Sequence, residues 1–130
     1  MQEKFWGKVI HGLGKGKNFG FATINIQMID STLHINKGVY AALVTIHNQT
    51  FKGMLYVGTR PTFELQKMSI EIHILDFKED IYNQQIFFQI LHKIREEIKF
   101  NNEDQLIKQL HQDKKMVYNY FQNNHTPFSF

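Results

Sequence analysis

Every second residue is isoleucine in the run Ser69-Ile70-Glu71-Ile72-His73-Ile74. An apolar residue at every second position is the period of a β-strand that has one face in a core. The isoleucines therefore belong to one face, and Ser69, Glu71 and His73 belong to the other. We predict a strand here that buries its isoleucines and presents a carboxylate to a surface or cleft.

Five further segments are rich in β-branched or aromatic residues and are separated by turn-forming residues. They are residues 5–11, 22–26, 38–47, 50–56 and 85–94, and the isoleucine run itself extends to residue 77. The segment 78–83 joins the last two strands, and its Asn83 can adopt the left-handed turn conformation. Six short strands with no helix between them favour a closed antiparallel barrel over a β-α-β sheet.

A helical period begins near residue 102. Asn102 is a candidate N-cap, two acidic residues follow it, and Gln105 at the third helical position resembles a capping box. Apolar residues then recur at helical spacing to about residue 121, at Leu106, Leu110, Val117 and Phe121. We predict a helix packed on the barrel, followed by a loose tail at 124–130. Asp113 falls on the apolar stripe and needs a partner, for which we expect Arg95.

The composition predicts one globular domain over residues 1–130. Forty-two per cent of the residues are hydrophobic, and there is no cysteine, which suits a reducing cytoplasm. The longest apolar stretch, Val39–Ile46, is too short to span a bilayer. Met1–Lys4 contains an acid where a signal peptide carries bases, so we expect no signal peptide and no membrane attachment. The net charge of +3 suits a phosphate-bearing ligand as well as nucleic acid.

A glycine cluster with two lysines lies between the first two predicted strands. Its residues are Gly12, Gly14, Lys15, Gly16, Lys17 and Gly20. Glycines let backbone N–H groups approach an anion closely, so this segment is a candidate phosphate cradle. Asn18 breaks the Walker A pattern, and the dinucleotide fingerprint fails because a strand follows. A flexible hairpin loop remains the alternative.

The next residues, Gly20-Phe21-Ala22-Thr23-Ile24-Asn25, begin a resemblance to the riboflavin kinase family. That family carries a glycine-rich loop followed by Gly-(aliphatic or Phe)-Pro-Thr-Ala-Asn. Further matches follow in order at residues 37–41, at 53–63, at 71–77 together with 80–82, and at 94–100. The resemblance covers about residues 5 to 115, and five ordered motifs make chance agreement a poor explanation.

The resemblance implies a six-stranded Greek-key barrel with a C-terminal helix. It implies a kinase that transfers the γ-phosphate of MgATP to the 5′-hydroxyl of riboflavin and so makes FMN. Thr23 and Asn25 match the residues that coordinate Mg²⁺ and the terminal phosphates of ATP, with the glycine-rich loop beside them. Glu71 matches the catalytic base, and Arg95 matches an arginine on the flavin side.

The residues themselves leave simpler interpretations open. Thr23 and Asn25 are two apart in a predicted strand, so they share a face and could share one ion, but they could also line a polar solvent face. Glu71 could be an exposed strand carboxylate, and Arg95 could form a surface ion pair of little value. The chain also departs from the family at three positions. Ala22 replaces the motif proline, Ile24 replaces its alanine, and Tyr56 stands where asparagine is usual.

Two other functional classes compete with the kinase. A small basic barrel with exposed aromatic residues could bind single-stranded nucleic acid, although we expect no significant binding. The three departures could also mark a non-catalytic flavin-binding barrel.

Many bacterial relatives carry an FMN adenylyltransferase domain before this module. The present sequence offers no strand, phosphate loop and helix in that order, so we expect this chain to make FMN without converting it to FAD.

Overall fold

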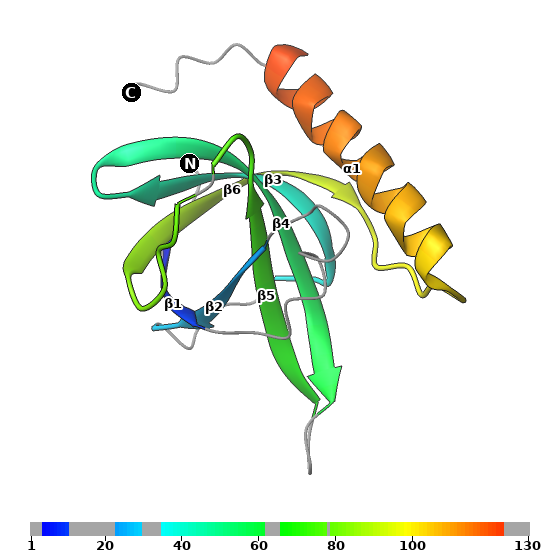
Figure 1. The fold of residues 1–130 in the computed structure, drawn as a ribbon, viewed down its shortest axis with the longest axis horizontal. Helices are drawn as coiled ribbons and strands as arrows, with labels where there is room; N and C mark the ends of the chain where they lie inside the picture. Colours follow the sequence, from blue (N-terminus) through cyan, green and yellow to red (C-terminus); the bar gives the residue numbers. More distant parts are fainter. Residues whose placement is uncertain (1–3, 11–22, 30–34, 62–65, 78, 124–130) are drawn as a thin grey trace.

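The computed structural model describes residues 4–10, 23–29, 35–61, 66–77 and 79–123 (Figure 1). Six strands and one helix make up this part of the chain. They are β1 (Lys4–Ile10), β2 (Ile24–Met28), β3 (Gly38–Ile46), β4 (Gln49–Pro61), β5 (Gln66–Ile74), β6 (Gln85–Arg95) and α1 (Glu103–Asn123). The glycine-rich loop and the predicted tail at 124–130 lie outside the described residues.

The strands close into a barrel in the order β1-β2-β5-β4-β3-β6, and every neighbouring pair is antiparallel. Strands β3, β4 and β5 are consecutive neighbours, while β6 returns to lie beside β3, which is the Greek-key arrangement. The predicted six-stranded antiparallel Greek-key barrel with a C-terminal helix is therefore confirmed. No helix in the described part of the chain is long and apolar enough to cross a membrane.

The inside of the barrel is filled by alternate residues from all six strands. Ile70, Ile72 and Ile74 of β5 lie in this cluster, as their alternation predicts, and Phe88 of β6 is its largest fully buried side chain. Residues directly opposite Ile72 complete the same layer, with Ile24 on β2 and Leu55 on β4. Glu71 consequently projects from the outer face of the barrel.

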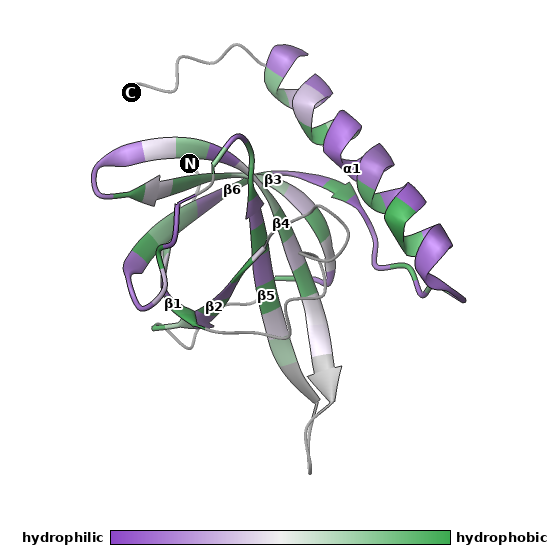
Figure 2. Ribbon diagram, in the orientation of Figure 1, coloured by the Kyte–Doolittle hydropathy of each residue, from purple (hydrophilic) through white to green (hydrophobic). Residues whose placement is uncertain are grey.

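A second apolar cluster lies between the outer wall of the barrel and α1, which packs along one side (Figure 1). Its buried residues are Val39, Ala41, Leu43, Met54, Leu75, Leu110, Val117 and Phe121. Strand β3 contributes alternate residues to both clusters, so it is buried on both faces. This explains why Val39–Ile46 is a nearly continuous apolar run rather than an alternating one. Along α1, hydrophobic and hydrophilic bands alternate, as Figure 2 shows.

The predicted cap of the helix is confirmed. The backbone N–H of Gln105 donates to Asn102 Oδ1 at 2.9 Å, the bond expected of an N-cap. The return bond of the capping box differs by one residue, because Gln105 Oε1 accepts from the N–H of Asn101 at 3.2 Å and not from that of Asn102. The helix therefore starts where the sequence predicts, and the Asn102 side chain satisfies one orphan N–H donor of its first turn.

Two strands have bounds that differ from the prediction by three residues or more. The predicted strand at 50–56 runs on to Pro61 as β4, where Gly58 pairs with Ser69 and Pro61 with Gln66 of β5. The predicted strand at 69–77 ends at Ile74, because Asp76 adopts a positive φ of 58° that turns the chain away. Asn83 also has a positive φ, of 70°, as predicted for the turn before β6.

Candidate active site

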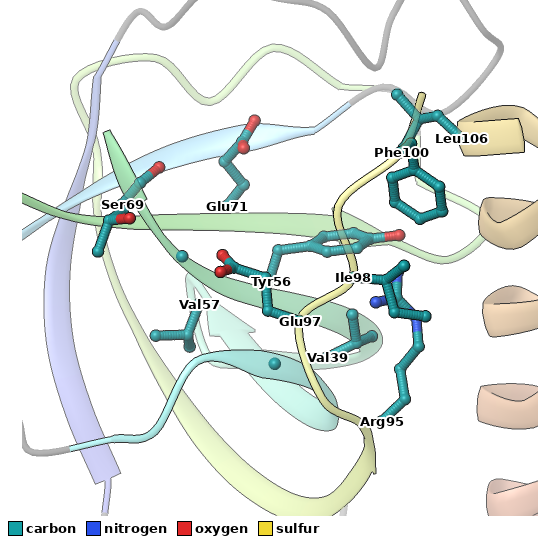
Figure 3. A pocket seen from close by; sticks show the side chains of 13 residues that line it. Val39, Tyr56, Val57, Ser69, Glu71, Arg95, Glu97, Ile98, Phe100 and Leu106 are labelled. Carbon is teal, nitrogen blue, oxygen red and sulfur yellow. The ribbon is translucent and has the colours of Figure 1, made fainter. Parts of the chain in front are cut away.

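A cleft of about 480 Å³ lies on the outer wall of the barrel (Figure 3). Strands β4 and β5 form its floor, and the segment 95–100 and the first turn of α1 form its far wall. Polar and charged residues on its surface include Glu71, Arg95 and Glu97, and apolar ones include Tyr56 and Phe100. The cleft therefore offers a planar apolar surface next to carboxylates and a guanidinium group.

Glu71 connects this cleft to strand β2. It lies directly opposite Asn25 on one side and Tyr56 on the other, so the three side chains stand in one row on the outer face. The hydroxyl of Thr23 donates to Glu71 Oε1 at 3.2 Å. The structure thus brings together Thr23, Asn25 and Glu71, the three residues for which the family resemblance implies metal binding and proton transfer.

The local structure around Thr23 differs slightly from the expected strand. Strand β2 begins at Ile24, so Thr23 immediately precedes it, and Ala22 lies outside the described residues. Asn25 is buried at 5% exposure, while Ile24 packs against the barrel core. The larger side chain at residue 24 is therefore accommodated on the face opposite to Asn25, as its position in the strand predicts.

Arg95 and Asp113 form a bidentate ion pair. Arg95 Nε lies 2.7 Å from Asp113 Oδ1, and Nη2 lies 2.7 Å from Asp113 Oδ2. The expected partnership is confirmed, and the simpler interpretation of Arg95 as a surface ion pair is wrong, because the Asp113 side chain is fully buried. The pair joins the end of β6 to the middle of α1 at the wall of the cleft.

Tyr56, which stands where the family usually has asparagine, lies in the centre of the cleft. Its ring points from β4 toward Ile98 and Phe100 in Figure 3. Burial raises the pKa of the phenol well above its ordinary value, and the negative charge of Asp113 raises it further. The hydroxyl donates weakly to Met54 Sδ at 3.7 Å.

The segment after β6 supplies lining residues that had no predicted role. Glu97, Ile98 and Phe100 all face the cleft. Glu97 can approach the floor because Gly58 has no side chain, and a Cβ built there would lie 3.1 Å from Glu97 Oε2. The family motif at 94–100 marked this segment in the sequence, but only the fold shows that its residues lie over β4.

The donor chemistry fits a magnesium ion that arrives with a nucleotide. Thr23 offers a hydroxyl oxygen and Asn25 an amide oxygen, next to the carboxylate of Glu71. Among the described residues, no group of three or more acidic, histidine or cysteine side chains is arranged to hold a metal ion. Neutral oxygens beside one carboxylate suit Mg²⁺ that keeps several water and phosphate ligands.

Comparison with known proteins identifies the family. The family model described as flavokinase, riboflavin kinase, matches residues 2–121. A bifunctional riboflavin kinase/FMN adenylyltransferase from Haemophilus influenzae is 37% identical over 119 residues, which is 91% of this chain and 38% of that protein. An RNA-binding riboflavin kinase from Bacillus subtilis is 38% identical over 114 residues, which is 85% of this chain and 48% of that protein. The chain thus spans less than half the length of these relatives.

Solved structures agree on the fold. A crystal structure described as a macrolide-efflux protein from Streptococcus pneumoniae superposes with a TM-score of 0.83 at 34% identity, over 89% of this chain and 38% of that one. The riboflavin kinase from Trypanosoma brucei superposes with a TM-score of 0.63 at 22% identity, over 92% of this chain and 79% of that one. With the family match over nearly the whole chain, these findings lead to one conclusion: the chain belongs to the riboflavin kinase family.

Proposed function

We propose that this chain phosphorylates riboflavin, using MgATP and releasing FMN and ADP. The observation that carries the proposal is the row formed by Asn25, Glu71 and Tyr56, with the Thr23 hydroxyl 3.2 Å from Glu71. Glu71 and Tyr56 of this row lie on the floor of the cleft. Within a riboflavin kinase family member, this row supplies oxygens for a metal-bound phosphate and a carboxylate for a hydroxyl proton. Both are needed for phosphoryl transfer.

In the proposed reaction, Glu71 accepts the proton of the riboflavin 5′-hydroxyl as the hydroxyl oxygen attacks the γ-phosphorus. The new bond joins that oxygen to phosphorus. The bond from the γ-phosphorus to the β–γ bridging oxygen breaks, and ADP keeps the electron pair. The hydrogen bond from Thr23 holds Glu71 in place, since a positioned base contributes more than a mobile one.

The nucleotide belongs on the β2 side of Glu71 in this proposal. Thr23 and Asn25 would hold Mg²⁺ and the terminal phosphates there, and the ion would neutralise part of the phosphate charge. Gly12, Gly14 and Gly16, with Lys15 and Lys17, enclose the phosphates from the loop that precedes β2. Their part in the proposal rests on the sequence alone, because these residues lie outside the described part of the chain.

Riboflavin belongs on the other side of Glu71, over Tyr56. The half-buried rings of Tyr56 and Phe100, with the exposed side chain of Ile98, suit the flat apolar ring system of a flavin. Arg95 lies at the same wall and supplies N–H donors. With tyrosine in place of the usual asparagine, the cleft keeps one side-chain hydroxyl, which donates weakly to Met54 Sδ.

The proposal extends to the setting of the enzyme. Relatives named as bifunctional riboflavin kinase/FMN adenylyltransferases make fusion to an adenylyltransferase domain the expected natural context. A sequence without cysteine suits a reducing compartment, and we place the protein in the cytoplasm.

Separation of products by HPLC after incubation with riboflavin and MgATP tests the proposal. We expect FMN and ADP in equal amounts, with no FMN when Mg²⁺ is chelated. Tight flavin binding without turnover would instead identify the non-catalytic flavin-binding barrel.

The nucleic-acid alternative has one supporting observation, the half-exposed Trp6 that packs against Phe87 with Lys4 over the Phe87 ring. Salt-dependent retention of a single-stranded oligonucleotide, with no FMN formed, would favour it over the kinase.

A further inference from the structure

Within the described part of the chain, only some of the N–H groups of the Arg95 guanidinium donate hydrogen bonds. Three of its five N–H groups have acceptors: Nε and one Nη2 hydrogen on Asp113, and one Nη1 hydrogen on the carbonyl of Glu96 at 3.0 Å. Within the described part of the chain, the remaining two, one on each terminal nitrogen, have no acceptor. The guanidinium group lines the cleft, and its carbon lies 5.9 Å from the ring centre of Phe100. One edge of Arg95 is thus fixed while the other can meet a ligand.

The group that fixes Arg95 is remote from the ligand. Asp113 is fully buried in the middle of α1 and is not among the residues that line the cleft. Gln109, one turn earlier on the helix, donates from Nε2 to Asp113 Oδ1 at 2.9 Å. Both carboxylate oxygens of Asp113 therefore have partners, and the carboxylate has a single defined orientation.

Stability alone is a poor explanation for this arrangement. Taking two charges out of water costs about as much as their attraction returns, and well-packed apolar residues often stabilise such a site more. The neighbours of Asp113 on the helix stripe, Leu110 and Val117, are apolar and already supply the contact with the barrel. What a bidentate pair adds is a fixed plane for the guanidinium group.

We propose that Asp113, supported by Gln109, is a positioning residue that orients Arg95 for riboflavin. Through this pair the flavin side of the cleft depends on α1 being docked, although no atom of Asp113 touches the ligand. The inference rests on the proposed function, because it assumes that riboflavin occupies the cleft beside Arg95. It predicts an effect on riboflavin affinity that is separate from MgATP affinity and from stability.

The test compares Asp113→Asn with Val117→Ala, in the full 130-residue chain. Riboflavin affinity is measured by the quenching of flavin fluorescence, MgATP affinity by calorimetry, and folding by the urea midpoint. We expect Asp113→Asn to weaken riboflavin binding roughly 10- to 100-fold, the range for loss of a charge-assisted hydrogen bond, with less than about twofold change for MgATP. Val117 is equally buried on the same helix face, so its truncation should lower the urea midpoint and leave riboflavin affinity unchanged.

A milder variant covers the case in which Asp113→Asn does not fold. Gln109→Met keeps the ion pair but removes one support of the carboxylate, and we expect a smaller loss of riboflavin affinity with MgATP affinity kept. Unchanged riboflavin affinity in a folded Asp113→Asn, or in Gln109→Met if that is the only folded variant, would overturn the positioning role. An equal loss in Val117→Ala would overturn it as well, because helix docking alone would then explain the effect. Failure of the unaltered chain to bind riboflavin would overturn the proposed function and this inference together.

Discussion

Replacing Gly38 by alanine should damage both the barrel and the cleft. Gly38 opens β3 at the cleft wall with a φ of 153°, a conformation that residues with a side chain rarely adopt. A Cβ built there would lie 2.6 Å from the carbonyl oxygen of Arg95 and 3.1 Å from Lys93 Cε. The first contact is with backbone, so it can be relieved only by separating β3 from the end of β6.

The size of the effect follows from two costs. A strained φ costs about 1–3 kcal/mol, and overpacking against backbone costs a further 1–3 kcal/mol or so. We therefore expect Gly38→Ala to lower the free energy of unfolding by about 2–6 kcal/mol. The carbonyl that must move belongs to Arg95, so riboflavin affinity should fall as well in whatever fraction remains folded.

Gly58→Ala is the matched control. Gly58 lines the same cleft, but its added Cβ would meet only Glu97 Oε2, at 3.1 Å, which is the end of a flexible exposed side chain. We expect a change in unfolding free energy within about 0.5 kcal/mol. Urea denaturation followed by circular dichroism measures both variants. Equal stability of Gly38→Ala and Gly58→Ala would refute the reasoning from the close contact with backbone.

The remaining predictions concern the nucleotide side and the helix. Thr23→Val and Asn25→Leu should each weaken MgATP binding more than riboflavin binding, because each removes an oxygen from the proposed metal site, and calorimetry with both ligands should show the difference. Asn102→Ala should cost about 1 kcal/mol in urea denaturation, since it removes the N-cap bond to Gln105. Asn101→Ala is its control and should cost little, because Asn101 takes part through its backbone N–H.

Local patterns in the sequence predicted most of the fold because they are set by single elements. The isoleucine alternation of β5 and the cap at Asn102 each depend on a few neighbouring residues, and both were confirmed. The length of β4 was not predictable in this way. Gly53, Gly58 and Pro61 interrupt its local pattern, and pairing with β5 from Gly53 onward carries the strand to Pro61.

The candidate site was predictable only in part. Spacing could place Thr23 and Asn25 close together, but the contact of Thr23 with Glu71 spans 48 positions of sequence and depends on β2 pairing with β5. The partnership of Arg95 with Asp113 could be expected, because a carboxylate on an apolar helix face needs a partner. The position of Glu97 over Gly58 had no such local signal, since it depends on how the segment after β6 crosses the barrel wall.

The most direct test of the central claim is the turnover of Glu71→Gln. Glutamine keeps the shape of the side chain and can still accept the hydrogen bond from Thr23, so the row with Asn25 and Tyr56 should remain intact. FMN formation from riboflavin and MgATP should fall by about two to four orders of magnitude, the contribution of a positioned general base. Both substrates should bind as they do to the unaltered chain. Near-normal FMN formation by this variant would contradict the account, because the proton would then leave by a route that does not involve Glu71.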